Sequence, residues 1–249
     1  MPTYTPYGAF RSPVSPLEAD RAKATRVRSM FDTIAPRYDL FNDVLSAGVH
    51  RLWRADAIDA LAPVPGRRYL DLCAGTLDLA RAVVARAPGA VAVGFDFSLP
   101  MLRRGASKLD GQPSVLPVAA DALALPVTDG VFAGCTIGFG LRNLVDFEAG
   151  LSEMHRVLDT GGRLVVLEFT TPPGRLFRTL YHGYFHHLLP RAGALIAGDA
   201  NAARYLPDSV ADFPDCEALS DMLTNVGFSR VRFRLLSRGI AALHTGVKE

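Results

Sequence analysis

The sequence predicts an α/β fold in which an open, mostly parallel sheet alternates with helices and carries a ligand site at its strand ends. Residues 69–80 have the pattern of an apolar strand that ends near Asp71, a tight turn at Gly75 and a helix. Two further apolar runs end in Asp96 and Asp121, each 25 residues after the preceding acid. Because ligands bind at the carboxyl ends of parallel strands, these acids are expected to line one site.

The turn at Gly75 favours a cationic ligand without phosphate. A glycine there lets the backbone approach a ligand, although a strand-helix unit also uses glycine for backbone reasons alone. A pyrophosphate site would need the pattern G-x-G-x-x-G, whereas Leu77 stands two residues after Gly75. Carboxylates attract a sulfonium and an amino group but repel a pyrophosphate. The pattern resembles the S-adenosylmethionine site of class I methyltransferases and disfavours a Rossmann dehydrogenase.

Length and composition indicate one ordinary globular domain. The chain has 249 residues, 49% hydrophobic and 21% charged, with a net charge of +2. This charge is too small, and its Lys and Arg too scattered, to indicate a nucleic-acid partner. Cys73, Cys135 and Cys216 lack metal-ligand spacing and are expected to be reduced core residues. No apolar run is long enough to span a membrane and no secretory pattern is present, so a soluble cytoplasmic protein is expected. The sequence does not distinguish a monomer from a homo-oligomer.

The chain is expected to begin with a flexible proline-rich tail over residues 1–20, followed by a single domain over residues 21–249. Residues 21–60 form a helical cover in this interpretation, because Val27, Met30 and Ile34 recur at one-face spacing. After the fifth strand, residues 172–203 form an inserted aromatic helical segment, which either packs on the core, walls an apolar pocket or touches a membrane surface. A helix near residues 218–226 and two strands, 230–236 and 240–247, complete the domain as an antiparallel edge hairpin.

Several motifs together resemble the ubiquinone/menaquinone biosynthesis C-methyltransferases. The similarity runs from about residue 24 to the carboxyl terminus, so it covers nearly the whole chain. The motifs are Tyr38-Asp39, Asn42, Leu45-Ser46, Gly48, His50-Arg51 and Trp53, then residues 135–143, 156–168, 205–209, 213–214 and 239–248.

This resemblance implies a Rossmann-like class I fold with a seven-stranded, mostly parallel sheet and S-adenosylmethionine as cofactor. It implies C-methylation of a prenylated quinol, demethylmenaquinol to menaquinol, with the ubiquinone-pathway benzoquinol as the alternative acceptor. Because the acceptor carries a long prenyl tail, peripheral contact with the inner face of the cell membrane is expected. A non-catalytic S-adenosylmethionine-binding protein ranks lower, and methyl transfer to a quinol would distinguish it.

The expected site residues follow from the strand ends and from the resemblance. A phenol ionises near pH 10, so the site must supply a base or stabilise the phenolate. Arg142 is expected to stabilise the phenolate or order a water, with Asn143 beside it, and the candidate proton acceptors are His50, Tyr38 and Asp199. No metal site is expected. The expected cofactor residues are Asp71, Gly75, Thr76, Asp96, Phe97, Asp121, Ala122 and Gly138.

Two positions depart from the family pattern. The family usually has a second glycine where this chain has Leu77, and often a serine where it has Gly138. Each departure affects one expected cofactor contact.

Three other classes of methyltransferase are disfavoured because their motifs are missing from the sequence. Methylases of nucleic-acid amino groups would show an Asn/Asp-Pro-Pro-Tyr turn, and cytosine C5 methylases a Pro-Cys nucleophile. Metal-dependent catechol methyltransferases would show a carboxylate cluster.

Overall fold

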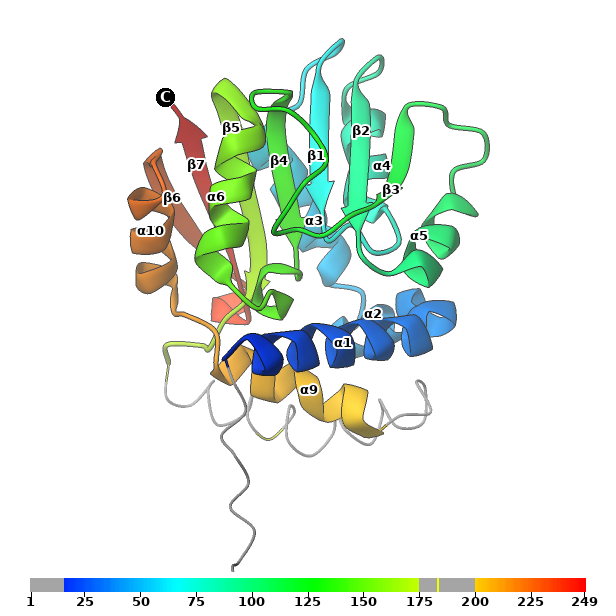
Figure 1. The fold of residues 1–249 in the computed structure, drawn as a ribbon, viewed down its shortest axis with the longest axis vertical. Helices are drawn as coiled ribbons and strands as arrows, with labels where there is room; N and C mark the ends of the chain where they lie inside the picture. Colours follow the sequence, from blue (N-terminus) through cyan, green and yellow to red (C-terminus); the bar gives the residue numbers. More distant parts are fainter. Residues whose placement is uncertain (1–15, 175–182, 184–199) are drawn as a thin grey trace, which may run out of the picture.

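A seven-stranded sheet forms the centre of the computed structural model, which describes residues 16–174, 183 and 200–249 (Figure 1). The strands are β1 (Arg68–Leu72), β2 (Val91–Asp96), β3 (Val115–Ala119), β4 (Phe132–Gly138), β5 (Leu158–Phe169), β6 (Phe228–Leu236) and β7 (Ala241–Lys248). Their order is β3-β2-β1-β4-β5-β7-β6. Strands β1 to β5 are parallel, and β7 is antiparallel to both β5 and β6. The predicted seven-stranded sheet with an antiparallel edge hairpin is confirmed.

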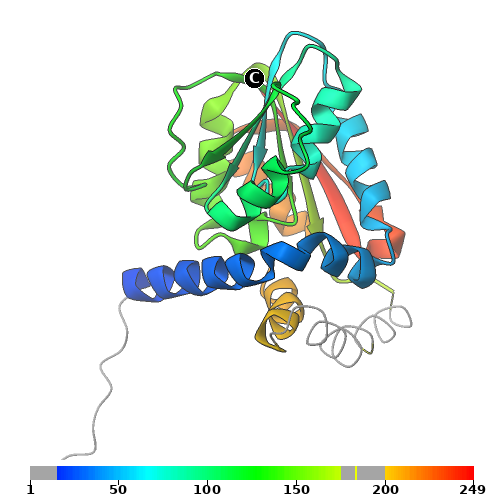
Figure 2. The same ribbon diagram turned by 90° about the vertical axis from the view of Figure 1, so that its right-hand side faces the viewer.

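Helices cover both faces of the sheet (Figure 2). One layer contains α3 (His50–Leu61), α4 (Asp78–Arg86) and α5 (Leu99–Ala106), and the other contains α6 (Phe147–Val157) and α10 (Cys216–Asn225). In β1, Tyr69 packs with Ile58 of α3, whereas Leu70 and Leu72 share a core with Leu151 of α6. This two-sided burial explains why the central strands are continuous apolar runs.

The amino-terminal helices cross the carboxyl ends of the strands (Figure 1). They are α1 (Pro16–Ile34), the short η1 (Ala35–Arg37) and α2 (Tyr38–Ser46). The helix begins at Pro16, before the expected start at Arg21, because proline fits the first turn, where its missing N–H leaves no hydrogen bond unmade. Of the expected cover, α1 and α2 lie over the strand ends, whereas α3 packs on the sheet against β4 and β5.

The site lies where the strand order reverses. β1 has β2 on one side and β4 on the other, so the connections after β1 and β4 turn in opposite directions and leave a crevice between them. Three residues near these strand ends have left-handed backbone angles: Cys73 with φ 53°, Leu77 with φ 63° and Phe139 with φ 59°. Such conformations are unfavourable for side-chain-bearing residues and concentrate at functional sites.

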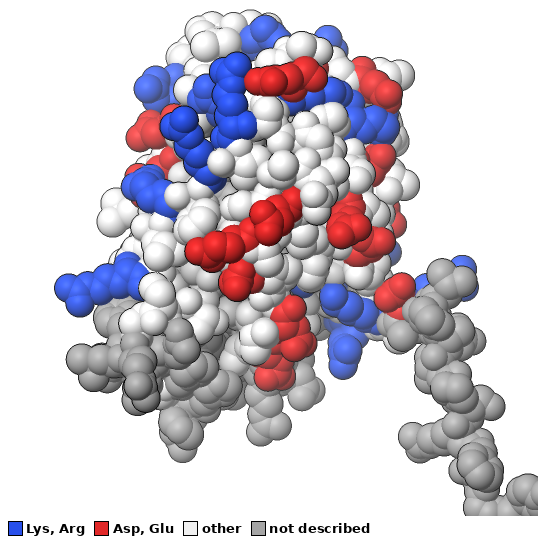
Figure 3. Space-filling model, turned by 90° about the vertical axis from the view of Figure 1, so that its left-hand side faces the viewer, with Lys and Arg blue, Asp and Glu red and all other residues white. Residues whose placement is uncertain are grey.

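Most of the expected 172–203 segment lies outside the described residues; the description resumes with α9 (Ala200–Ala211). In the described part of the chain, no helix combines the length and apolar character needed to cross a bilayer. Figure 3 shows the side of the molecule that carries β6 and α10, where basic and acidic side chains are both present. The charge on this face is therefore mixed in sign.

Candidate active site

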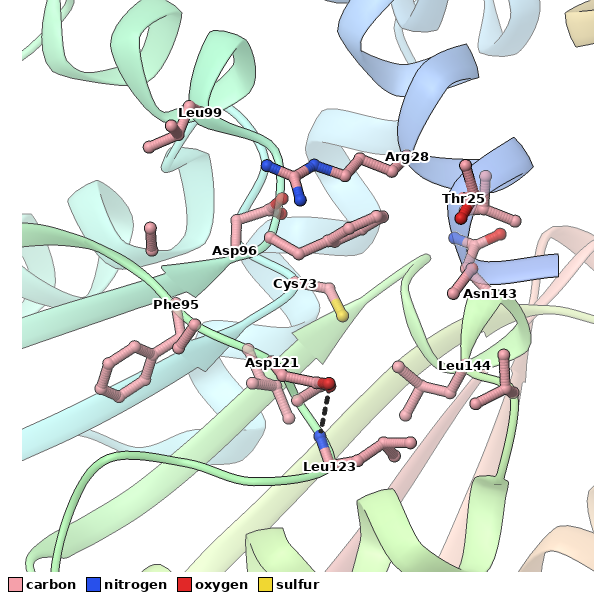
Figure 4. A pocket seen from close by; sticks show the side chains of 18 residues that line it. Thr25, Arg28, Cys73, Phe95, Asp96, Leu99, Asp121, Leu123, Asn143 and Leu144 are labelled. Atoms are coloured by element: carbon pink, nitrogen blue, oxygen red, sulfur yellow. Dashed lines mark hydrogen bonds between the residues drawn. The ribbon is translucent and has the colours of Figure 1, made fainter. Parts of the chain in front are cut away.

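A cavity of about 420 Å³ opens at the carboxyl ends of β1, β2 and β3, beneath α1 (Figure 4). Its volume falls in the range of about 300–1,000 Å³ that is usual for small-molecule sites. The acids expected at the strand ends, Asp96 and Asp121, both line it. Helix α1 adds Thr25 and Arg28, which the sequence analysis missed, because nothing in a helical pattern says which helix will cover a distant strand end.

Asp96 ends β2 and is held rigidly at the wall of this cavity. Its side chain is 7% exposed. One carboxylate oxygen accepts a hydrogen bond from the backbone N–H of Gly75 at 2.8 Å, and the other accepts one from Ser98 at 2.8 Å. Burial raises the pKa of Asp96, and these backbone N–H groups oppose the rise. Because each oxygen has a second lone pair, the carboxylate can still accept hydroxyl groups from a ligand.

The far end of the cavity is apolar with one exposed acid. Phe97, Ala122 and Leu123 line it, so a flat ring can stack there. The carboxylate of Asp121 accepts a hydrogen bond from the backbone N–H of Leu123 at 2.9 Å, the dashed line in Figure 4. This bond orders the turn after β3 and leaves the second carboxylate oxygen of Asp121 available.

A small cavity of about 20 Å³ shares lining residues with this site and with a second pocket. Asp71, Gly75, Thr76 and Gly138 line it. It shares Cys73 with the large cavity. It also shares two residues with the aromatic pocket described below, Tyr38 and Arg54. The eight expected cofactor residues therefore lie around two adjoining cavities.

Asp71 stands one residue before the end of β1 and is nearly fully buried, at 2% exposure. Its carboxylate accepts hydrogen bonds from the backbone N–H of Ala80 at 3.0 Å and from the hydroxyl of Thr136 at 3.0 Å. Burial outweighs these bonds and raises the pKa of Asp71 to about 7. The carboxyl group is therefore poised between its neutral and charged forms near neutral pH.

Thr76 joins the turn after β1 to the amino-terminal cover. Its hydroxyl donates to the carboxylate of Asp39 on α2 at 2.9 Å. Lys108, which follows α5, bridges Asp39 at 3.1 Å and Asp78 at 2.8 Å, and Arg54 of α3 pairs with Asp78 at 2.6 Å. The hydroxyl of Thr76 is thus already used within the protein, and the cover closes on the same turn that carries the expected cofactor residues.

The aromatic pocket, of about 50 Å³, lies between the cover and the ends of β4 and β5. The ring centroids of Phe139 and Phe169 are 4.6 Å apart, and Trp53 packs against both at 6.0 and 6.1 Å. The pocket is lined by Phe31, Tyr38, Phe41, His50, Phe139, Arg142, Phe169 and Tyr205, among others. Such walls suit a flat, apolar ring.

Arg142 lines this pocket, but its charge is paired. Its guanidinium donates to the carboxylate of Glu168 at 2.8 Å and to the carbonyl of Phe139 at 2.5 Å. Arg142 is 8% exposed and Glu168 is 2% exposed, so the pair is desolvated, and removing one partner would leave a buried charge. The sequence analysis missed Glu168, although it stands one residue before the end of β5, as Asp71 does in β1.

Asn143 lines the large cavity rather than the aromatic pocket. Its amide nitrogen donates to the carbonyl of Phe139 at 3.2 Å, and its amide oxygen accepts the hydroxyl of Tyr205 at 3.0 Å. Asn143 therefore joins the loop after β4 to α9. The last expected catalytic residue, Asp199, lies outside the described residues.

His50 and Tyr38 meet in the aromatic pocket. The Nδ1 atom of His50 is 2.6 Å from the hydroxyl oxygen of Ser46, and its Nε2 atom is 3.6 Å from the carboxylate of Asp43. Burial lowers the pKa of His50, which is 6% exposed, and burial raises the pKa of Tyr38. Near neutral pH both groups are therefore uncharged, the imidazole as a base and the phenol as an acid.

Comparisons with known proteins agree with this architecture. The model of the ubiE/COQ5 methyltransferase family matches residues 19–248. The chain is 50% identical over 218 residues to the "Demethylmenaquinone methyltransferase" of Thermus thermophilus, covering 87% of this chain and 99% of that one. It is 40% identical over 232 residues to the "Ubiquinone/menaquinone biosynthesis C-methyltransferase UbiE" of a Ruegeria species, covering 92% and 93%.

The fold is also that of solved methyltransferases. A structure from Thermotoga maritima, described as a SAM-dependent methyltransferase, matches with a TM-score of 0.61 at 18% identity, covering 90% of this chain and 100% of that one. At this identity the match concerns the fold alone.

Proposed function

The chain belongs to the ubiE/COQ5 methyltransferase family, and we propose that it transfers a methyl group to a ring carbon of a prenylated quinol, converting demethylmenaquinol to menaquinol. It is an S-adenosylmethionine-dependent C-methyltransferase. The observation that carries the proposal is a row of adjoining cavities. The large cavity lined by Asp96 and Asp121 shares Cys73 with the small cavity, and the small cavity shares Tyr38 with the aromatic pocket. The relative with 50% identity is named for demethylmenaquinone, which favours the naphthoquinol over the benzoquinol.

The residues of the larger cavity fit S-adenosylmethionine. When bound, this cofactor supplies a methyl group on a positively charged sulfur that leaves as a neutral thioether. Asp96 is proposed to accept the ribose hydroxyls, and Phe97 with Ala122 to contact the adenine beside Asp121. The small cavity, with Gly75, Thr76, Gly138 and the carboxyl group of Asp71, is proposed to receive the methionine end, where a carboxylate favours the cationic groups.

The aromatic pocket is proposed to hold the quinol ring. Because the pair of Arg142 and Glu168 is neutral overall, it stabilises a phenolate less than a free cation would. We therefore assign Arg142 the role of shaping the pocket and donating a hydrogen bond to the quinol oxygen, with Asn143 anchoring its loop. The prenyl tail requires the protein to reach the membrane surface, so we further propose peripheral contact of the cytoplasmic protein with the bilayer.

A direct assay tests this function. The purified protein, given S-adenosylmethionine and chemically reduced demethylmenaquinone in detergent, is expected to yield quinone with one added methyl group by mass spectrometry. Replacing the quinol by the demethylated benzoquinol of the ubiquinone pathway tests the alternative acceptor. Methylation of the benzoquinol alone would contradict the naphthoquinol assignment, and methylation of neither would contradict the function.

The cofactor assignment has its own control. Asp96→Ala removes a buried acceptor and is expected to weaken cofactor binding by about 2–4 kcal/mol, roughly 30- to 1,000-fold, measured by calorimetry. Asp59→Asn, at an exposed acid of α3, is the matched variant that should leave the affinity unchanged. Equal affinities of Asp96→Ala and the unaltered protein for S-adenosylmethionine would contradict the assignment of Asp96 to the ribose hydroxyls.

A further inference from the structure

We propose that His50 accepts the hydroxyl proton of the quinol and passes it to solvent through a polar cavity on the other side of its ring. The inference rests on the proposed function, since it requires a phenolic acceptor in the aromatic pocket. C-methylation of a quinol needs a base, and His50 is proposed to be that base. Arg142 cannot serve in this role, because its guanidinium stays protonated and is paired with Glu168.

His50 stands between two cavities. It lines the aromatic pocket and also a polar cavity of about 360 Å³. Asn42 and Arg54 line both cavities as well, so these three residues form the partition between them. The other residues of the polar cavity are charged: Asp39, Asp43, Arg51, Asp78, Arg81 and Lys108. A proton on the imidazole is therefore one step from a polar, solvent-connected space.

The hydrogen bonds of Ser46 set the tautomer of His50. The hydroxyl of Ser46 donates its single proton to the backbone carbonyl of Asn42 at 2.8 Å. Its oxygen is then an acceptor toward Nδ1 of His50, at 2.6 Å, so Nδ1 carries the ring proton. The lone pair is consequently on Nε2, at the far end of the ring. A neutral imidazole fixed in this tautomer is ready to take a proton.

The charges around His50 favour this role. Burial is the main cause that lowers its pKa, Arg54 adds to the lowering, and Asp43 opposes it. The neutral base therefore predominates at pH 7. Once protonated, Nε2 faces the carboxylate of Asp43 at 3.6 Å, which stabilises the imidazolium. The charged or titratable groups around His50 are Asp43 of α2, Arg51 and Arg54 of α3, Asp78 of α4, and Tyr38, Arg142 and Tyr205 in the aromatic pocket.

The two tyrosines of the pocket, Tyr38 and Tyr205, are weaker candidates. Burial raises the pKa of each, so each holds its own proton at pH 7 and can donate a hydrogen bond but cannot accept a proton as a base.

The proton balance closes without a further reagent. His50 takes the hydroxyl proton, and the electron pair this leaves on oxygen makes the ring carbon nucleophilic. The methyl group forms its bond to that carbon, and the bond from the methyl group to sulfur breaks with its pair on sulfur. The ring carbon then loses its own proton to water, a proton from water restores the ring hydroxyl, and the proton held by His50 leaves through the polar cavity. Each turnover thus releases one proton.

Nitrogen NMR of the full-length protein tests the geometry without turnover. In protein labelled with ¹⁵N at histidine, His50 is expected to show the proton on Nδ1 and a titration below the usual pKa of 6.5. Ser46→Ala removes the acceptor for that proton and is expected to shift the tautomer population toward Nε2–H. A proton on Nε2 in the unaltered protein would overturn the proposal.

Kinetics test the chemical role. His50→Gln is expected to lower kcat by about 10²–10⁴-fold while cofactor affinity stays within about twofold, because only proton transfer is lost. It should also abolish the acidic limb of the kcat profile that follows His50. The matched control is His155→Gln, a half-buried histidine of α6 packed on Phe228, which should retain the unaltered kcat and profile.

Asp43→Asn keeps His50 in place, so it tests the role of His50 as the base even if His50→Gln fails to fold. Because Asp43 raises the pKa of His50, its removal should move the acidic limb to lower pH. An unmoved limb in Asp43→Asn, or unaltered kcat in His50→Gln, would overturn the role of His50 while quinol methylation by the unaltered protein still stands. Failure of the unaltered protein to methylate any quinol would overturn the proposed function and this inference together.

Discussion

In the proposed cofactor site, the carboxyl group of Asp71 is expected to link ligand binding to protonation. In the free protein its pKa is raised to about 7 by burial, above the ordinary value of 3.8, so the neutral form it favours contributes stability at low pH that is lost as pH rises through about 7. A cation bound in the adjoining small cavity would favour the charged form and lower this pKa. Binding of S-adenosylmethionine near pH 7 should therefore release a fraction of a proton.

Calorimetry in buffers of different ionisation enthalpy measures this proton release directly. The observed binding heat is expected to change with the buffer near pH 7 and to become independent of it near pH 9, where Asp71 is already ionised. Asp71→Asn, which keeps the shape, should remove the dependence at pH 7. A binding heat that is the same in all buffers at pH 7 would show that the ligand does not act on this carboxyl group.

At the scale of elements, Leu77 explains how the turn after β1 departs from the family pattern. Its backbone is left-handed, with φ 63°, a conformation that glycine adopts without strain. Its side chain is fully buried and occupies the space left by two glycines. A Cβ atom built on Gly94 would lie 2.4 Å from the Leu77 side chain, and one on Gly105 would lie 2.7 Å from it. The backbone strain is thus offset by packing of α4 onto β2 and α5.

The same reasoning explains Gly138. A Cβ atom there would lie 2.7 Å from the side chain of Leu79, so the family's serine would collide with this leucine unless it moved. Leu79 is 6% exposed and belongs to the core between α4 and the sheet. The expected cofactor contact at this position is therefore limited to backbone atoms.

A double-mutant cycle tests the packing of Leu77 on Gly94. Gly94→Ala alone should destabilise the fold by about 1–3 kcal/mol through overpacking. In a Leu77→Ala background the clashing atoms are gone, so the same change should cost less, with a coupling of about 0.5–3 kcal/mol in chemical denaturation. Gly174→Ala is the control, since no residue that the structure describes lies within 4 Å of its Cβ position. Additive effects of the two substitutions would contradict direct packing.

At the scale of the whole molecule, the amino-terminal cover is attached to the sheet at and beside the proposed cofactor residues. Asp32 of α1 accepts the hydroxyl of Ser98 at 2.5 Å, next to Asp96. Asp39 of α2 accepts the hydroxyl of Thr76 at 2.9 Å and pairs with Lys108. Because α1 also lines the larger cavity, a cofactor bound there as proposed would leave only if these contacts open or if the ligand passes beneath them.

Weakening this attachment should shorten the residence time of the cofactor. Asp39→Asn leaves Lys108 with one carboxylate fewer, and for a half-buried pair worth about 1 kcal/mol we expect the cofactor dissociation rate to rise roughly fivefold. A stopped-flow chase of bound S-adenosylmethionine by its product measures this rate. The exposed pair of Asp59 and Arg86 provides the control, Asp59→Asn. Identical dissociation rates in both variants would show that the cover does not retain the ligand.

The sequence by itself determined the sheet, the order of its helices and the acids at the strand ends. These features depend on local period and on turn chemistry, because a buried parallel strand must be largely apolar and a carboxylate is accommodated best at or near its end. Asp71, Asp96 and Asp121 were found in this way, and all line the adjoining cavities. Glu168 is likewise an acid near the end of an apolar strand and could have been predicted in the same way.

Only the tertiary structure decided which of these groups face one another. Arg142 meets Glu168 because β4 and β5 are neighbours in the sheet, and Thr76 meets Asp39 because α2 folds over the turn after β1. His50 lies between two cavities and 2.6 Å from the hydroxyl oxygen of Ser46, because α3 packs beneath α2. A local pattern states that a side chain is buried or polar, but its pKa and its partners depend on residues far away in the chain, which only the packed fold brings within hydrogen-bonding distance.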